Sequence, residues 1–208
     1  FLRTDIDVFI GGGYDHFAKR ADGKNLIDNL KASGYEVVTS ADMLRNSDTP
    51  SKLAALVYPD QPPYRLSGRG EMLYDATRKS IDILSKNKKG FFLMIEGSQI
   101  DWAGHANAAD TLIDETLDFD RAVGVALDFA KADRNTLVIV TADHETGGVT
   151  ITGGDIKTRR TRLQFSTKGH SAIMLPVYAF GPGAGNFTGI YDNTDIPKKI
   201  LNAYMFNK

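Results

Sequence analysis

The 208-residue sequence lacks cysteine, a marked excess of charge of either sign, and any long apolar run. Without cysteine the chain has no disulfide and no thiolate ligand, so a bound metal would need carboxylates and imidazoles. A formal net charge of −1 gives no broad basic surface, which argues against nucleic acid as the main partner. No apolar stretch approaches the roughly 20 residues of a membrane-spanning helix, and the N-terminus has no signal-peptide layout.

Apolar residues make up 42% of the chain, enough for a substantial core, and the simplest organisation is a single α/β domain over residues 1–208. Short apolar runs predict strands. They lie at residues 8–10, 35–38, 53–58, 91–95, 136–140, 149–151, 172–174 and 176–180. Helical spacing alternates with them. It predicts helices from residue 14, over 26–33, 71–86, 105–131 and 196–205, with a short helical or irregular piece at 40–50.

Three further features have both an ordinary and a functional interpretation. Glycines 11–13 follow the first strand without the spacing of a dinucleotide or P-loop fingerprint, so a plain turn is favoured over a phosphate loop. The basic stretch 157–162 is interpreted as a solvated irregular loop, with contact to an anionic substrate as the alternative. Aspartates on the long helix are interpreted as its solvated side; they are Asp110, Asp114, Asp118 and Asp128.

Two apolar runs are followed by residues of types that commonly bind metals in proteins. The run 91–95 stops at Glu96, and the run 136–140 leads into Asp143 and His144. Unbroken apolar runs are typical of strands buried on both faces in parallel sheets, where ligands bind beyond the carboxyl ends of the strands. The pattern predicts that both runs deliver acidic and imidazole side chains to one sheet edge, as a metal site.

The chain has four histidines, and three of them lie beside acidic residues or in a glycine turn at the ends of elements. Asp101 and His105 are four residues apart, a spacing that can aim both side chains at one point. His170 lies in a glycine-flanked turn, while His16 is interpreted as a surface residue. A lone histidine more often makes a structural hydrogen bond. Together, the imidazole and carboxylate side chains favour zinc, whereas the carboxylate of Glu96 suits magnesium. Several such ligands indicate paired ions, and paired ions indicate a metal-assisted hydrolase or transferase.

At these residues the sequence resembles the metal-binding core of alkaline phosphatases. The resemblance is carried by GFFLMIEGSQIDWAGHANAA, TLVIVTADHETGG, and KGHS before VYAFGPGA, and it covers nearly the whole chain. It implies an α/β fold, a three-layer sandwich with a mainly parallel central sheet flanked by helices, incomplete in this chain. Residues 1–208 would then be the C-terminal portion of a larger domain, and the abrupt start at Phe1 is expected to be internal.

The resemblance also implies roles for individual residues. Asp101, His105 and His170 match the ligands of the first zinc, Asp143 and His144 match ligands of the second, and Glu96 matches a magnesium ligand. Trp102 stands near the substrate, where some members carry lysine or histidine.

No catalytic nucleophile is expected in this chain, because the family's Asp-Ser-Ala segment does not occur in it. The resemblance implies that the full-length protein hydrolyses phosphate monoesters with two zinc ions and one magnesium ion. It also implies a homodimer in the periplasm or outside the cell. The chain alone is expected to bind one zinc or none, to be inactive, and to associate through exposed sheet edges. The alternatives are another phosphotransferase or phosphodiesterase of the superfamily, and a non-catalytic metal-binding domain.

Overall fold

A computed structural model describes residues 4, 6–48 and 50–204 of the chain. These residues form two compact units. The first holds the described part of Phe1–Gly97 with Leu117–Ala122, and the second holds Ser98–Thr116 with the described part of Val123–Lys208. A single α/β domain spanning both units stays a prediction. No helix in the described ranges is both long and apolar enough to cross a membrane.

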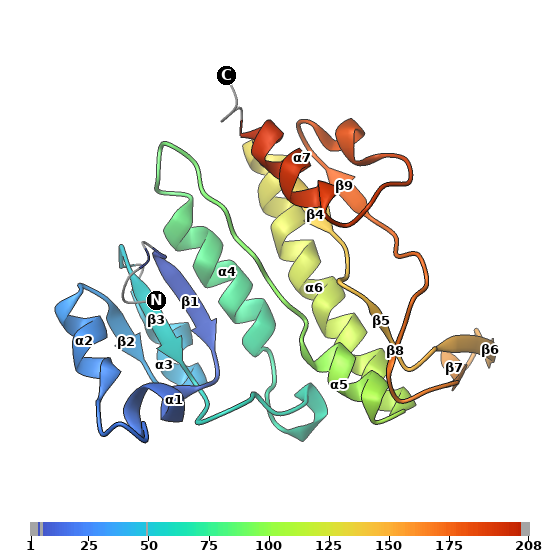
Figure 1. The fold of residues 1–208 in the computed structure, drawn as a ribbon, viewed down its shortest axis with the longest axis horizontal. Coiled ribbons are helices and arrows are strands. Elements are labelled where there is room, and N and C mark those ends of the chain that lie inside the picture. The colour runs from blue at the N-terminus through green and yellow to red at the C-terminus, as the bar shows by residue number, and fades with distance from the viewer. Residues whose placement is uncertain (1–3, 5, 49, 205–208) are drawn as a thin grey trace. The chain divides into compact units, whose positions relative to one another are not determined.

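The first unit is built on a parallel sheet with strand order β1-β3-β2 (Figure 1). These strands are Val8–Gly11, Leu53–Leu56 and Glu36–Val38 in that order, and Leu53 of β3 pairs with Val8 on one side and Glu36 on the other. Every residue of β3 is buried, as expected for a central strand of a covered parallel sheet. The helices of this unit are α1 Tyr14–Ala18, α2 Leu26–Ala32, α3 Ala41–Asn46, η1 Arg65–Ser67 and α4 Met72–Leu84.

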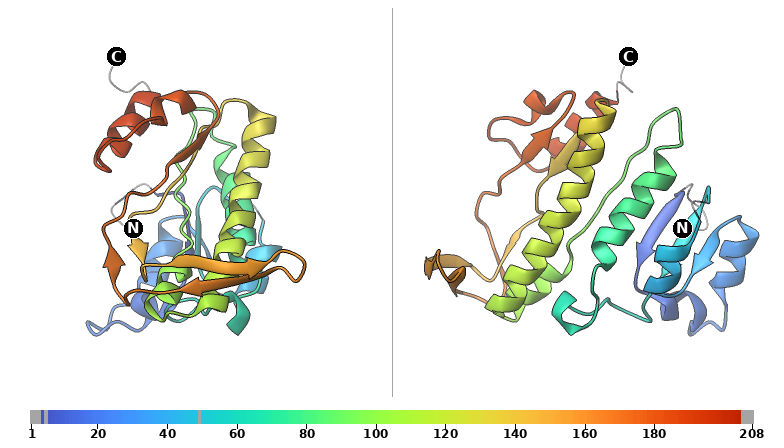
Figure 2. Two further views of the ribbon diagram at one scale, coloured as in Figure 1. Left: turned by 90° about the vertical axis from the view of Figure 1, so that its right-hand side faces the viewer. Right: turned by 180° about the vertical axis from the view of Figure 1, so that it is seen from behind.

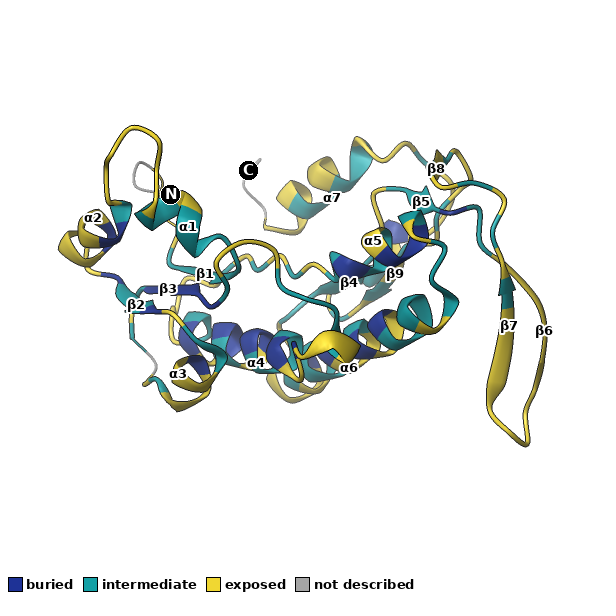
Figure 3. Ribbon diagram, turned by 90° about the horizontal axis from the view of Figure 1, so that it is seen from below, coloured by how far each residue is buried: buried dark blue, intermediate teal, exposed yellow. Residues whose placement is uncertain are grey.

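Helices cover both faces of this sheet and give three layers. Leu53 and Ala55 belong to a buried cluster with Leu44 of α3 and Met72 of α4. The alternate residues Ala54 and Leu56 belong to a second cluster with residues of α2. Successive side chains of β3 therefore pack into two different cores. The buried residues of the helices are dark blue in Figure 3. The predicted α/β sandwich with a parallel sheet is confirmed.

Of the three glycines, Gly11 ends β1, and Gly12 and Gly13 form a turn. Gly13 has φ 95° and its N–H donates to the Asp60 carbonyl at 2.9 Å. A Cβ on Gly12 would lie 1.8 Å from the same oxygen. Glycine is needed at residue 12 for close backbone approach and at residue 13 for the left-handed conformation, which explains these two glycines by the turn itself.

The second unit contains three antiparallel strand pairs. They are β4 Val138–Val140 with β9 Tyr178–Phe180, β5 Glu145–Thr146 with β8 His170–Ser171, and β6 Thr150–Asp155 with β7 Arg160–Gln164. Its helices are α5 Gln99–His105, most of α6 Ala109–Asp133, η2 Ala184–Phe187 and α7 Asp195–Ala203. Figure 2 shows β6 and β7 as a two-stranded ribbon.

Two predicted strands are wrong. Residues 91–95 are extended but form no strand, and Phe92 and Met94 are 63% and 77% exposed. A strand is defined by a ladder with a neighbouring strand, and the ladders among the described residues do not include this segment. Residues 172–174 likewise form no strand, because the ladder beside them ends at Ser171.

Other predictions were wrong in extent or environment. The helix expected over 105–131 is α6, which begins at Ala109, and the separate helix α5 that ends at His105 was not predicted. Asn107 lies between the two helices, and its φ of 53° interrupts helical geometry. The basic stretch 157–162, expected to be irregular, lies in the turn between β6 and β7 and in β7 itself, which begins at Arg160. Asp118 was expected on the solvated side of the helix but is buried. The last helix ends at Ala203, and residue 205 of its predicted range lies outside the described residues.

Candidate metal centre

Helix α5 presents Asp101 and His105 on one face. Their spacing of four residues is about one helical turn, so their side chains lie on the same side of the helix. His105 Nε2 lies 3.4 Å from Asp101 Oδ1, and both side chains are a little under 40% exposed. The pair is therefore open to an ion from solvent and held on a rigid element.

His105 is fixed by a backbone group. Its Nδ1 lies 2.6 Å from the Lys168 carbonyl oxygen. Because a carbonyl only accepts hydrogen bonds, we infer that the ring proton resides on Nδ1. Nε2 then keeps its lone pair on the side of Asp101, which is the arrangement that hydrogen bonds to the far ring nitrogen produce in metal-binding histidines.

His170 reaches the same point from strand β8. It lies directly opposite Thr146 of β5 in the antiparallel ladder, so these two side chains share one face of the pair. His170 Nε2 lies 3.5 Å from Asp101 Oδ1 and 3.2 Å from His105 Nε2. Residues far apart in sequence thus bring one oxygen and two nitrogens together.

These three atoms fit a zinc ion. Tetrahedral coordination with Zn–N and Zn–O bonds near 2.0–2.1 Å requires neighbouring ligand atoms to be about 3.3–3.4 Å apart. The observed separations of 3.4, 3.5 and 3.2 Å match this value on all three sides. Nitrogen and oxygen ligands without sulfur are a combination that zinc accepts, and three protein ligands leave a fourth position open.

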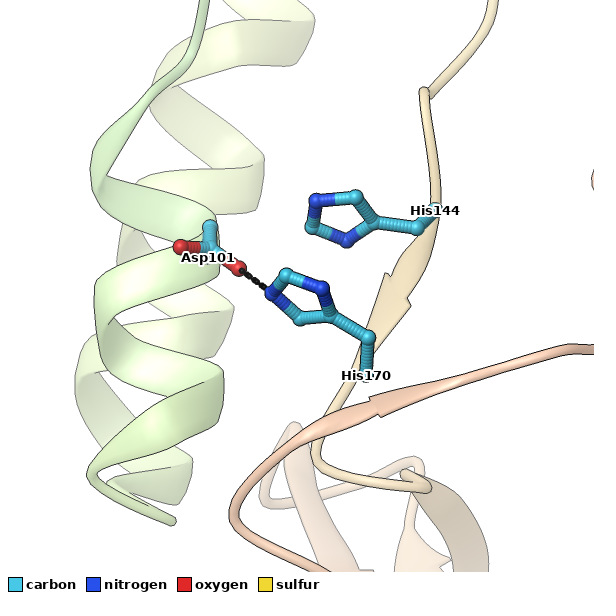
Figure 4. Close-up of side chains that lie close together, drawn as sticks. All are labelled: Asp101, His144 and His170. Carbon is cyan, nitrogen blue, oxygen red and sulfur yellow. Dashed lines mark ion pairs between the residues drawn. The ribbon is translucent and has the colours of Figure 1, made fainter.

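His144 adjoins this group and allows a second grouping. One ligand atom from each of Asp101, His144 and His170 lies within 4.8 Å of the others (Figure 4). The rings of His144 and His170 are stacked with centroids 3.5 Å apart. We favour His105 over His144 as the third ligand of the first ion, because its separations are those of a single tetrahedral ion.

Asp143 and His144 form a separate pair beside the first group. Asp143 Oδ2 lies 3.2 Å from His144 Nε2, again a separation suited to two ligands of one ion. The Asp143 side chain is 85% exposed. The pair supplies two ligands, so an ion here would need further ligands from outside it.

Glu145 stabilises the β5–β8 strand pair through hydrogen bonds. Its carboxylate accepts hydrogen bonds from the Ser171 hydroxyl and from the backbone N–H groups of Gly148 and Val149 at 3.1 and 2.9 Å. Desolvation raises the pKa of Glu145, but these hydrogen bonds outweigh it and keep that pKa below its ordinary value. Glu145 and Ser171 face away from Thr146 and His170 across the ladder, so they support the site from behind.

The remaining candidate residues are Trp102, Glu96 and His16. Trp102 is half-exposed on α5, one residue on from Asp101 and therefore on a different side of the helix. Glu96 is exposed at the end of the extended segment 91–97, in the first unit. His16 is exposed, as predicted, and its Nε2 lies 3.1 Å from Asp60.

Sequence reasoning missed the supporting residues. Thr146, Glu145, Ser171 and the Lys168 carbonyl were not predicted. A signal existed for Thr146, because it is two residues beyond His144 and positions i and i+2 of a strand share a face. No such signal exists for the Lys168 carbonyl, because every residue has a backbone carbonyl.

Comparison with known proteins identifies a family for the chain. The family model for alkaline phosphatase matches residues 1–160. Alkaline phosphatase 3 of Bacillus subtilis is 32% identical over 97% of this chain and 59% of its own length. Alkaline phosphatase of Escherichia coli is 33% identical over 94% of this chain and 52% of its own length.

Solved structures extend the comparison to the fold. Alkaline phosphatase from the Antarctic bacterium TAB5 matches with a TM-score of 0.90 and 43% identity, over 100% of this chain and 63% of that one. A variant of the TAB5 enzyme solved with Mg bound matches with a TM-score of 0.88, 43% identity and the same coverage. The chain thus spans between about half and two thirds of the length of these relatives. It belongs to the alkaline phosphatase family.

Proposed function

We propose that this chain is the zinc-binding C-terminal part of an alkaline phosphatase, and that the protein carrying it hydrolyses phosphate monoesters. The observation that supports this most directly is the triangle of Asp101 Oδ1, His105 Nε2 and His170 Nε2, with sides of 3.2 to 3.5 Å. Family membership supports the reaction class, since the relatives named above are alkaline phosphatases.

In this proposal each candidate residue has one role. Asp101, His105 and His170 hold the first zinc, Asp143 and His144 contribute to the second, and Glu96 contributes to a magnesium ion. Paired metal ions supply electrostatic stabilisation to the attacking and leaving oxygens of a phosphoryl displacement. The residues of this chain position those ions. Trp102 lies near the phosphate and affects how tightly it is held.

The chain by itself is proposed to be inactive. It contains no Asp-Ser-Ala segment to supply a nucleophile. With the covalent route absent, a zinc site alone lacks a group that positions phosphate for attack. The protein carrying the chain is proposed to hold two zinc ions and one magnesium ion, and to act as a homodimer in the periplasm or outside the cell.

A pair of chromogenic substrates tests the reaction. The protein that carries this chain is assayed on p-nitrophenyl phosphate and on bis(p-nitrophenyl) phosphate, before and after dialysis against a chelator. We expect hydrolysis of the monoester well above that of the diester, lost on chelation and restored by zinc with magnesium. Preference for the diester would indicate a phosphodiesterase of the superfamily instead. Zinc binding without hydrolysis of either compound would indicate a non-catalytic metal-binding protein.

A further inference from the structure

Thr146 contacts two of the candidate ligands at once. Its hydroxyl Oγ1 lies 2.5 Å from Asp101 Oδ1 and 3.2 Å from His144 Nδ1. Asp101 belongs to the group proposed for the first ion, and His144 belongs to the pair proposed for the second. One hydroxyl therefore lies between the two candidate metal positions.

The position of Thr146 is set by two neighbouring elements. In the β5–β8 ladder it lies opposite His170, so its side chain is on the face that carries His170. Helix α5 approaches it closely at Gly104, where a Cβ would lie 2.8 Å from the Thr146 carbonyl oxygen and 3.0 Å from its Cβ and Cγ2. The absence of a side chain at Gly104 lets β5 lie against α5, with the hydroxyl within reach of Asp101.

The single proton of the hydroxyl decides how the two contacts are made. An ionised carboxylate only accepts, so the short contact to Asp101 uses the hydroxyl proton. The hydroxyl then has only lone pairs left for His144, and the proton in that contact must come from Nδ1 of the ring. Asp143 Oδ2 faces the other ring nitrogen, Nε2, at 3.2 Å, and an ion held between these two atoms would take the lone pair of Nε2. The Thr146 hydroxyl thereby favours the Nδ1–H tautomer, which leaves Nε2 for the ion.

The same bond orients Asp101. Its Oδ1 accepts from Thr146 and also lies nearest to the two ring nitrogens, His105 Nε2 and His170 Nε2. A carboxylate oxygen has two lone pairs, so one hydrogen bond fixes the rotation of the group and leaves the other pair for an ion. Outer bonds of this kind hold metal ligands in place and raise affinity.

We propose that Thr146 is a positioning residue that links the two candidate metal positions: one hydroxyl orients Asp101 for the first ion and selects the His144 tautomer that can bind the second. The proposal rests on the proposed function, because it takes these residues to be metal ligands. It adds a residue that touches neither ion, and it makes the hydroxyl, rather than the bulk of the side chain, the group that matters.

The first test uses the unmodified chain loaded with Zn²⁺. With ¹⁵N-labelled histidine, ring nitrogen shifts report which nitrogen of His144 carries the proton and which one binds the ion. We expect the proton on Nδ1 and the ion on Nε2. A proton on Nε2 would overturn the proposal, and this readout needs no variant to fold.

The second test uses Thr146→Val, which keeps the shape of the side chain without the hydroxyl, and Thr146→Ser, which keeps the hydroxyl. Thr150→Val on the exposed start of β6 is the matched control. Binding of Co²⁺ alone, followed by its visible absorption, gives the affinity of each chain. We expect Thr146→Val to bind about 10–100-fold more weakly and to lose the uniform His144 tautomer, while Thr146→Ser and Thr150→Val stay within about threefold.

The outcomes separate the two proposals. Unchanged affinity in Thr146→Val, or a loss in Thr146→Ser as large as in Thr146→Val, would overturn the role of the hydroxyl while leaving the metal site intact. Absence of Co²⁺ binding by the unmodified chain would instead remove the proposed zinc site itself, and the role of Thr146 with it.

Discussion

Asp118 on α6 is a fully buried carboxylate held between two guanidinium groups. Arg69 Nη2 donates to Oδ2 at 2.8 Å and Arg121 Nη2 donates to Oδ1 at 2.6 Å. The side chains of Arg69 and Asp118 are 6% and 0% exposed. Arg121 also pairs with Glu71 at 2.6 Å, and its hydrogen bond to Asp118 raises the pKa of the guanidinium. All four residues belong to the first unit.

Removing this carboxylate takes away the buried acceptor that the two guanidinium groups share. We expect Asp118→Ala to lower the free energy of unfolding by about 3–5 kcal/mol, the usual result of breaking a buried ion pair from one side. Asp128→Ala, at an 82% exposed position of the same helix, is the control and is expected to change it by less than about 0.5 kcal/mol. Urea denaturation measures both. Equal small effects would mean that the buried pair contributes nothing to stability.

For a single residue, the local sequence does not show whether the side chain is buried. The acidic residues of α6 follow a regular pattern, and Asp118 has the same type as the exposed Asp128. Its burial depends on Arg69, 49 positions away, and nothing local reports that pairing. The pairing of Asp101 with His105 was predictable, because a spacing of four residues is a local signal, whereas the strand predicted before Glu96 does not form.

The approach of α5 to β5 depends on Gly104. A Cβ at this position would meet backbone and Cβ atoms of Thr146 at 2.8–3.0 Å, and such atoms cannot move aside as the end of a flexible side chain can. Any shift of β5 would carry Thr146 and the adjoining His144 away from Asp101.

We expect Gly104→Ala to weaken zinc binding at least tenfold and to lower the unfolding free energy of the metal-free chain by about 1–3 kcal/mol, the usual cost of overpacking. The control is Gly124→Ala on α6, where no atom lies within 4 Å of an added Cβ. That change is expected to raise the unfolding free energy by about 0.5–1 kcal/mol through helix propensity alone. Calorimetric zinc titration and urea denaturation measure the two effects. Unchanged zinc affinity in Gly104→Ala would contradict the close packing.

Helices and strands were predicted correctly where the apolar periodicity is strong. Predictions failed where the formation of a strand depends on a neighbouring strand. The helices at 26–32 and 72–84 and the three strands of the parallel sheet follow from local pattern. Residues 91–95 have a strong strand pattern yet join none of the strand ladders among the described residues. The division between α5 and α6 depends on the positive φ of Asn107, which a window of helical spacing does not register.

For the molecule as a whole, apolar side chains are exposed on segments that lie outside the strand ladders of the described residues. Phe92 and Met94 stand out from the extended segment in the first unit, and Ile173 and Met174, 61% and 79% exposed, stand out beside β8 in the second. Such edges add strands from other chains.

We therefore expect the isolated chain to associate as its concentration rises, which sedimentation velocity measures. Met94→Lys should reduce the association, whereas Leu66→Lys, at a 63% exposed site on η1, should leave it unchanged. A monomer at all concentrations would refute this expectation.

The metal centre was predictable in residue type and only partly in geometry. Five of the six candidate ligands lie in one unit, and three of them have the separations of a zinc site. The predicted common sheet edge does not supply them: Asp101 and His105 come from a helix, and His170 comes from a short antiparallel pair.

Calorimetric titration of Zn²⁺ into the metal-free chain, with His16, His105 or His170 replaced, decides whether these side chains form a zinc site. His16→Asn is the matched control, since His16 is exposed and pairs with Asp60 in the other unit. We expect one tight zinc site in the unmodified chain and in His16→Asn, with affinity reduced on the order of 100-fold or more in His105→Asn and His170→Asn. Equal zinc affinity in all four chains would mean that neither His105 nor His170 is a ligand.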